Sequence, residues 1–156
     1  MIRAGIIGGA GYTAGELIRL LVNHPQVRLA FVHSTSNAGN RIADVHGGLE
    51  GDTELRFADT CDLASIDVLF LCSAHGESRK WLEANDVPAG VKIIDLAQDF
   101  RDESDGFVYG LPELNRDRIR TAERVANPGC FATAIQLALL PLAAAGLLTG
   151  EVHVTA

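Results

Sequence analysis

The sequence predicts an α/β fold: a Rossmann-like, doubly wound, mostly parallel sheet, truncated at the start of a second α+β domain. Three observations lead to this prediction. Short apolar, β-branched runs alternate with segments whose apolar residues recur at helical spacing. A glycine-rich turn follows the first run, and the last run has no later strand to pair with. Such alternation is typical of a parallel sheet covered by helices on both faces.

The first unit is a strand, a helix and a second strand. Residues 2–7 form a short apolar run, as expected of a buried parallel strand. Residues 14–22 carry leucines on one helical face, and this helix should end before Pro25. Residues 27–33 are the second strand. A β-α-β unit of about thirty residues is the first half of a doubly wound sheet.

The remaining elements follow from the same patterns. Residues 34–52 are rich in glycine and weakly patterned, which predicts a long functional loop. Further strands are predicted at residues 68–72, 91–95, 124–126 and 152–156, and further helices at residues 77–85 and 130–145.

Composition excludes several classes of function. The chain has 156 residues, of which 47% are hydrophobic and 21% charged, an ordinary globular composition. Its net charge of −7 argues against nucleic-acid binding and against an anionic membrane surface as partner. The apolar stretch at residues 134–148 is too short to span a bilayer, and no signal-peptide pattern begins the chain. Three scattered cysteines suggest neither disulfides nor a metal site, so we expect a reducing, cytoplasmic location.

The glycine-rich turn after the first strand predicts a dinucleotide site. Two registers fit the pattern, one starting at Gly8 and one at Gly9, and both continue through Gly11 to Ala14. Glycine allows the tight turn and lets main-chain amides approach a pyrophosphate at the helix N-terminus. A plain strand-to-helix turn is the alternative, and the complete β-α-β unit disfavours it. The predicted cofactor contacts here are Gly8, Gly11, Tyr12, Thr13 and Ala14.

The end of the second strand indicates which dinucleotide binds. NAD sites usually place a carboxylate there to bind the ribose 2′-hydroxyl. This chain instead has Ser34, Thr35 and Ser36, with Arg41 close behind and no carboxylate before Asp44. Hydroxyls and a guanidinium suit a 2′-phosphate. We therefore predict NADP(H) bound by Ser34, Thr35, Ser36 and Arg41; a polar surface loop is the alternative.

Cys130 is the candidate nucleophile. Pro128 and Gly129 end a predicted strand, and Cys130 begins the next helix. The positive end of the helix dipole and the unpaired amides there favour a thiolate, and the same amides could hold an oxyanion. A buried, unreactive thiol is the usual alternative, and we apply it to Cys61 and Cys72.

With these residues in view, the sequence resembles the N-acetyl-gamma-glutamyl-phosphate reductases, a branch of the semialdehyde dehydrogenase family that serves arginine biosynthesis. The resemblance covers nearly the whole chain. The matching motifs are residues 11–17 (GYTAGEL), 36–39 (SNAG), 75–78 (HGES), 95–101 (DLAQDFR), 109–116 (YGLPELNR) and 127–134 (NPGCFATA). The last two motifs together are highly specific.

The resemblance implies a reaction. The Cys130 thiolate would attack an acyl phosphate and release phosphate, and hydride from NADPH would reduce the resulting thioester toward the semialdehyde. It also implies that Ser73 and Pro128 contact the cofactor, and that Pro128 and Gly129 bring Cys130 beside the nicotinamide. Arg101 and Glu113 lie in family motifs, where substrate binding and ordinary ion pairing are both open.

The family has a second domain that supplies an acid/base histidine, the dimer surface and much of the substrate pocket. No histidine of this chain matches that position. The resemblance thus implies an NADP(H)-binding domain at residues 1–129, followed at residues 130–156 by the nucleophile-bearing helix and the start of the catalytic and dimerisation domain. Two alternatives stay open: an aminoadipyl-phosphate reductase of lysine biosynthesis, and a non-catalytic NADP(H)-binding module.

Overall fold

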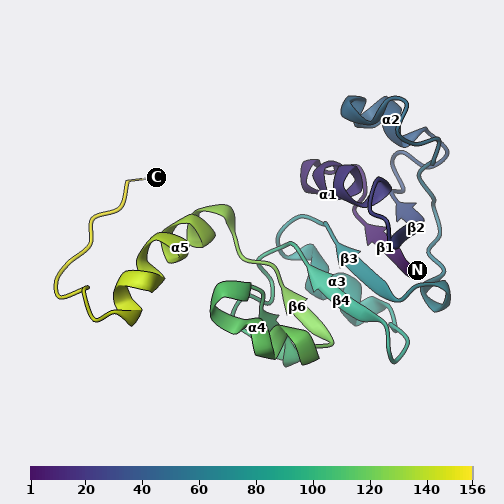
Figure 1. The fold of residues 1–156 in the computed structure, drawn as a ribbon. Helices are drawn as coiled ribbons and strands as arrows, with labels where there is room; N and C mark the ends of the chain where they lie inside the picture. Colours follow the sequence, from purple (N-terminus) through teal and green to yellow (C-terminus); the bar gives the residue numbers. More distant parts are fainter. Residues whose placement is uncertain (156) are drawn as a thin grey trace.

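The computed structural model describes residues 1–155 and contains a six-stranded parallel sheet with the strand order β2-β1-β3-β4-β6-β5 (Figure 1). The strands are β1 (Ile2–Ile7), β2 (Val27–His33), β3 (Val68–Leu71), β4 (Lys92–Asp95), β5 (Val108–Tyr109) and β6 (Arg124–Ala126). The helices are α1 (Tyr12–Val22), α2 (Ile42–Val45), α3 (Glu77–Ala84), α4 (Pro112–Thr121) and α5 (Cys130–Ala144), with 3-10 turns at Gly47–Leu49, Leu63–Ser65 and Ser104–Gly106.

The sheet has an apolar core on each face, which confirms the doubly wound prediction. Because side chains alternate along a strand, β3 contributes to both cores. Val68 and Phe70 pack with the cluster that contains Ile18 of α1. Leu69 and Leu71 belong to the opposite cluster, in which the rings of Phe100 and Phe107 stack.

The connection order creates a switch point at the carboxyl end of β1. From β1 the chain moves to β2 on one side, and it later returns to β3 on the other side of β1. The loops that leave β1 and β3 therefore diverge, and a crevice forms between them. Ligands of open α/β sheets bind in such crevices.

The structure adds elements to the predicted set. The predicted loop at residues 34–52 contains α2 and a 3-10 turn. The segment between β4 and β6 contains β5 and α4. Helix α4 is strongly charged and has no buried residue, so it lacks the apolar stripe by which helices are recognised.

The predicted strand at residues 152–156 is wrong for residues 152–155, which have no regular structure; Ala156 lies outside the described residues. A strand requires a neighbour to satisfy its main-chain groups, and no strand lies beside this segment in the described part of the chain.

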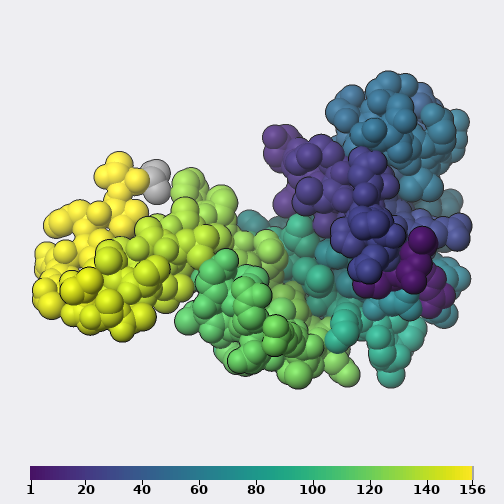
Figure 2. Space-filling view, viewed as in Figure 1, coloured from purple at the N-terminus to yellow at the C-terminus, as the bar shows by residue number. Residues whose placement is uncertain are grey.

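Helix α5 and the following residues form a lobe beside the sheet (Figure 2). None of the described residues from 130 onward is buried. A hydrogen bond from the Tyr109 hydroxyl to Oε1 of Gln136 (3.2 Å) ties the middle of α5 to β5. Within residues 1–155, no helix combines the length and apolar character needed to cross a membrane.

Candidate active site

A hollow of about 390 Å³ lies at the switch point, where β1, β2 and β3 end. Its walls come from the three segments that follow these strands, and no lining residue carries a carboxylate. The lining residues are Ile7, Gly8, Ala10, Gly11, His33, Ser34, Thr35, Ser36, Cys72, Ser73 and Ala74. Of the predicted cofactor contacts, the fold thus brings together Gly8, Gly11, Ser34, Thr35, Ser36 and Ser73.

The glycine turn forms the floor of the hollow. Gly8 has a φ of +76°, and a Cβ at this position would lie 2.8 Å from the carbonyl oxygen of Cys72. Both the backbone angle and the close approach of the main chain at Cys72, just after β3, therefore require glycine. The Gly11 amide donates to the Gly8 carbonyl (3.2 Å), and Gly11 caps α1. The first amides of α1 thus start at the edge of the hollow, as a pyrophosphate site needs.

The other predicted residues of this turn have different surroundings. Ala14 is fully buried against the sheet, so its small side chain serves the packing of α1. Tyr12 is 88% exposed and lines a neighbouring groove, and Thr13 is also exposed. Neither Tyr12 nor Thr13 lines the hollow.

His46 supports the glycine turn, and the sequence patterns did not reveal it. Its Nε2 lies 2.8 Å from the Gly9 carbonyl oxygen, so the Nε2–H tautomer donates a hydrogen bond to the turn. A Cβ on Gly15 would lie 2.5 Å from Nδ1 of the same ring. The sequence did contain one signal: Gly15 lies within the predicted helix, and a glycine there indicates that another group packs closely against the helix.

The serine-rich segment forms the wall after β2. Ser34 is buried, and its amide donates to the Ala58 carbonyl (3.0 Å). The hydroxyl oxygens of Ser34 and Ser36 lie 3.4 Å apart. Ser36 and Thr35 are exposed toward solvent. This wall offers hydroxyl groups and main-chain amides at the end of β2.

Arg41 is not among the lining residues. Its guanidinium makes ion pairs with Asp44 (3.5 Å), Glu50 (3.3 Å) and Glu54 (3.4 Å). These carboxylates are brought to it by the α2 segment and the chain after it. A phosphate at Arg41 would therefore compete with three carboxylates already in place.

The wall after β3 includes a buried cysteine, Cys72. Cys72 is buried, and burial, followed by the nearby charge of Asp95, raises the pKa of its thiol to about 12. The Asp95 carboxyl is itself fully buried at the end of β4 and accepts the Ala97 amide (3.2 Å). Burial also raises the pKa of Asp95. Cys72 thus stays a neutral thiol, in line with the unreactive role predicted for it.

Cys130 is the first residue of α5 and is exposed. Gly129 caps the helix, and both the amide and the hydroxyl of Thr133 donate to the Gly129 carbonyl (2.9 Å each). The first-turn amides have no partner within the helix, as at any helix N-terminus. Pro128 is half-buried and lies in the turn before Cys130, not in the hollow.

Cys130 and the hollow lie at the same edge of the sheet, because all six strands are parallel. Strand β6, which precedes Cys130, is three strand spacings from β1, roughly 14 Å at ordinary sheet geometry. An extended dinucleotide with its pyrophosphate at Gly8 bridges a distance of this order.

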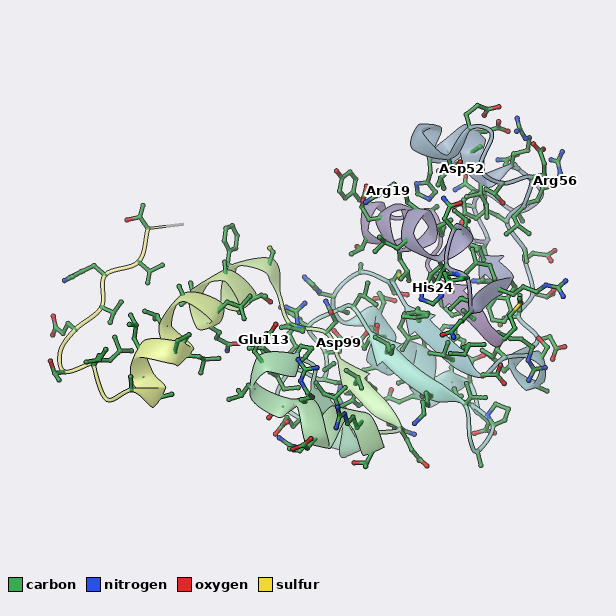
Figure 3. The ribbon with its side chains drawn as sticks, in the orientation of Figure 1. Arg19, His24, Asp52, Arg56, Asp99 and Glu113 are labelled. Atoms are coloured by element: carbon green, nitrogen blue, oxygen red, sulfur yellow. The ribbon has the colours of Figure 1, made fainter. Side chains whose placement is uncertain are left out.

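Arg101 and Glu113, for which substrate binding and ordinary ion pairing are both open, have different surroundings. Glu113 is exposed in the first turn of α4 (Figure 3). Arg101 is half-buried, and its Nε donates to the Asn127 carbonyl (2.9 Å). The Asp99 carboxylate accepts the amides of Gly76 (2.7 Å) and Arg79 (3.1 Å).

Comparison with known proteins places these features in a family. Residues 3–122 match the family model described as "Semialdehyde dehydrogenase, NAD binding domain". A protein of Bacteroides thetaiotaomicron named N-acetyl-gamma-glutamyl-phosphate reductase is 63% identical over 158 residues, covering 100% of this chain and 49% of that protein. One of the same name from Flavobacterium johnsoniae is 51% identical over 162 residues, covering 100% and 50%. The chain therefore spans about half the length of the curated relatives it matches.

Solved structures show the same fold at low sequence identity. The aspartate semialdehyde dehydrogenase of Candida albicans, solved with NADP, matches with a TM-score of 0.71 and 19% identity over 94% of this chain and 48% of that one. Aspartate semialdehyde dehydrogenase II of Vibrio cholerae, solved as a complex with ASA, matches with a TM-score of 0.68 and 22% identity over 93% and 47%.

Proposed function

The chain belongs to the semialdehyde dehydrogenase family, and from this premise we propose that it is the cofactor-binding, nucleophile-bearing part of an NADPH-dependent N-acetyl-gamma-glutamyl-phosphate reductase. The substrate class is supported by the relatives of that name, which align with the chain from end to end. The chemistry is supported by one observation above all. An exposed cysteine begins a helix at the same sheet edge as a glycine-floored hollow.

The hollow suits a dinucleotide phosphate. Gly8, in the floor of the hollow, lies so close to the main chain of Cys72 that a side chain on Gly8 is excluded. The free amides at the start of α1 lie beside this floor. We assign the 2′-phosphate to Ser34, Thr35 and Ser36, because a wall without carboxylates does not repel it. Arg41 has a secondary part in this proposal, since three carboxylates already surround it.

In the proposed reaction, the Cys130 thiolate attacks the acyl carbon of the acyl phosphate. The carbon–oxygen bond to phosphate breaks, phosphate leaves, and a thioester remains on Cys130. The unpaired amides at the start of α5 stabilise the negative charge that develops on the acyl oxygen. Bound NADPH supplies the hydride that reduces the thioester carbonyl. Cleavage of the carbon–sulfur bond then releases the semialdehyde and restores Cys130.

We assign residues 1–129 to the cofactor domain and residues 130–156 to the start of the catalytic one. The lack of burial from residue 130 onward supports this boundary. We further propose that an acid/base histidine and a homo-oligomer interface belong to a region matching the other half of the relatives, and that the enzyme is cytoplasmic.

The cofactor assignment predicts that Ser36→Asp lowers the preference for NADPH over NADH by about tenfold or more, because a carboxylate there would repel the 2′-phosphate. Fluorescence titration with each nucleotide measures the preference. Asn40→Asp is the matched control, since Asn40 is exposed in the same loop and lies outside the hollow. Equal binding of NADH and NADPH by the unaltered protein would overturn the NADP(H) assignment.

The nucleophile assignment predicts that Cys130→Ser abolishes reduction of NADP⁺ by N-acetylglutamate semialdehyde and phosphate, leaving under about 1% of the rate. The assay uses a polypeptide as long as the curated relatives. Cys61→Ser is the control, because burial raises the pKa of its half-buried thiol. Substantial activity in Cys130→Ser would contradict the mechanism. Faster turnover with aminoadipate semialdehyde than with N-acetylglutamate semialdehyde would instead assign the enzyme to aminoadipyl phosphate.

A further inference from the structure

Arg101 connects two segments that meet beside Cys130. Its Nε donates to the carbonyl oxygen of Asn127 (2.9 Å), in the turn after β6. Its Nη2 donates to the carbonyl oxygen of Leu96 (3.3 Å), just after β4. Among residues 1–155 no carboxylate forms an ion pair with Arg101, although the charge of the buried Asp95 is close enough to interact with it. The guanidinium is therefore held by main-chain groups.

Gly129 accommodates the same guanidinium. A Cβ on this residue would lie 2.8 Å from Nη1 of Arg101 and 3.5 Å from its Cζ. Gly129 has φ −72° and ψ 154°, a conformation that any residue adopts. The backbone therefore does not require glycine here. Glycine instead leaves room for the Arg101 guanidinium, which two main-chain hydrogen bonds hold in this position.

Helix α5 has few other attachments to the sheet. None of its residues is buried, and the Tyr109–Gln136 hydrogen bond lies in its second turn, away from Cys130. The direction in which Cys130 points thus depends on the turn at residues 127–129. That turn is joined to β4 by the Asn127 amide, which donates to the Asp95 carbonyl (2.8 Å), and by Arg101.

We propose that Arg101 is a positioning residue for Cys130: its guanidinium fixes the turn at residues 127–129 against the end of β4, and Gly129 is glycine to admit it. The inference rests on the proposed function in taking Cys130 as the nucleophile. It differs from a role in substrate binding, because Arg101 acts here through the main chain before any substrate arrives.

A double-mutant cycle tests the pairing of Arg101 with Gly129. The variants are Arg101→Gln, Gly129→Ala and the combination, and the readout is the rate of Cys130 alkylation by iodoacetamide without substrate, resolved by peptide mapping. Each single change should alter this rate by about fivefold, and the combination should add little to either. Coupling is expected because both changes disturb one contact.

Matched controls distinguish an effect on the position of Cys130 from a general loss of stability of the domain. Arg116→Gln alters an exposed arginine of α4, and Gly150→Ala alters a glycine with open space around it; both should leave the Cys130 rate unchanged. Buried Cys72 reports on folding, because it reacts only if the domain opens. If Arg101→Gln exposes Cys72, Gly129→Ala remains informative, since it removes no hydrogen-bonding group.

Kinetics in the full-length enzyme supply a second readout. Positioning predicts a lower kcat with KM for the acyl phosphate changed less than about twofold in Gly129→Ala. Additive effects in the cycle, or a rise in KM alone with normal alkylation of Cys130, would overturn the inference. Failure of the proposed function is distinguishable, because it would appear as full activity in Cys130→Ser.

Discussion

Gly15 lies in the first turns of α1, where alanine would normally be the better residue. In this structure the ring of His46 occupies the space that a side chain would need, while its Nε2 contacts the Gly9 carbonyl. The ring also lies against Phe57, with centroids 6.1 Å apart. A single histidine from the segment after β2 thus braces the helix and the glycine turn together.

Gly15→Ala is expected to lower the free energy of unfolding by about 1–3 kcal/mol, because the new methyl group would displace the His46 ring and its hydrogen bond. Urea unfolding measures the change. In a His46→Ala background the same substitution should be neutral or stabilising, since the ring is gone. Stabilisation by Gly15→Ala in the unaltered protein would show that helix propensity outweighs the contact.

An ion pair joins Arg3 of β1 to Asp67, the residue before β3. The Asp67 carboxylate accepts the amide of Arg3 (2.7 Å) and its Nη2 (2.8 Å). The side-chain hydrogen bond from Arg3, followed by the one from its amide, lowers the pKa of Asp67 to about 2. The folded state therefore favours the ionised carboxylate more than the unfolded chain does.

This shift determines the sign of a pH effect. The stability contributed by ionised Asp67 is present above about pH 4 and is lost as the pH falls toward about 2. We expect Asp67→Asn to be less stable than the unaltered protein at pH 6, with the difference shrinking between pH 4 and pH 2. Thermal unfolding across this range checks it, with Asp117→Asn, altered at a carboxylate that is 96% exposed, as the control. A difference independent of pH would contradict the assignment.

At the scale of the whole molecule, the sheet and α5 differ in how they are stabilised. Helix α1 packs Ala14 and Ile18 into the core. Helix α5 instead exposes Phe131, Leu137 and Leu142 to solvent within the described chain. Its first turn is linked to the sheet mainly through the Asn127–Gly129 turn and Arg101.

Amide hydrogen exchange should reveal this difference. Amides in the middle of α5 are expected to exchange at least about tenfold faster than those in the middle of α1, because α5 has no buried residue whereas α1 buries Ala14, Gly15 and Ile18. Mass spectrometry of peptides from the intact 156-residue chain measures both helices in one experiment. Equal protection of α5 and α1 would show that contacts outside those described here stabilise α5.

The sequence by itself determined the class of the fold, five of the six strands, the glycine turn and the helix that begins at Cys130, because these depend on local hydrophobic period and turn chemistry. It missed β5 and α4, the first too short and the second too polar to show such a period. Only the tertiary structure decided that Arg41 faces three carboxylates, that His46 replaces a side chain at Gly15, and that Arg101 occupies the space beside Gly129. Each of these contacts joins segments that are far apart in the chain or that the folding of a loop brings together. Local residue patterns do not show which of these segments meet.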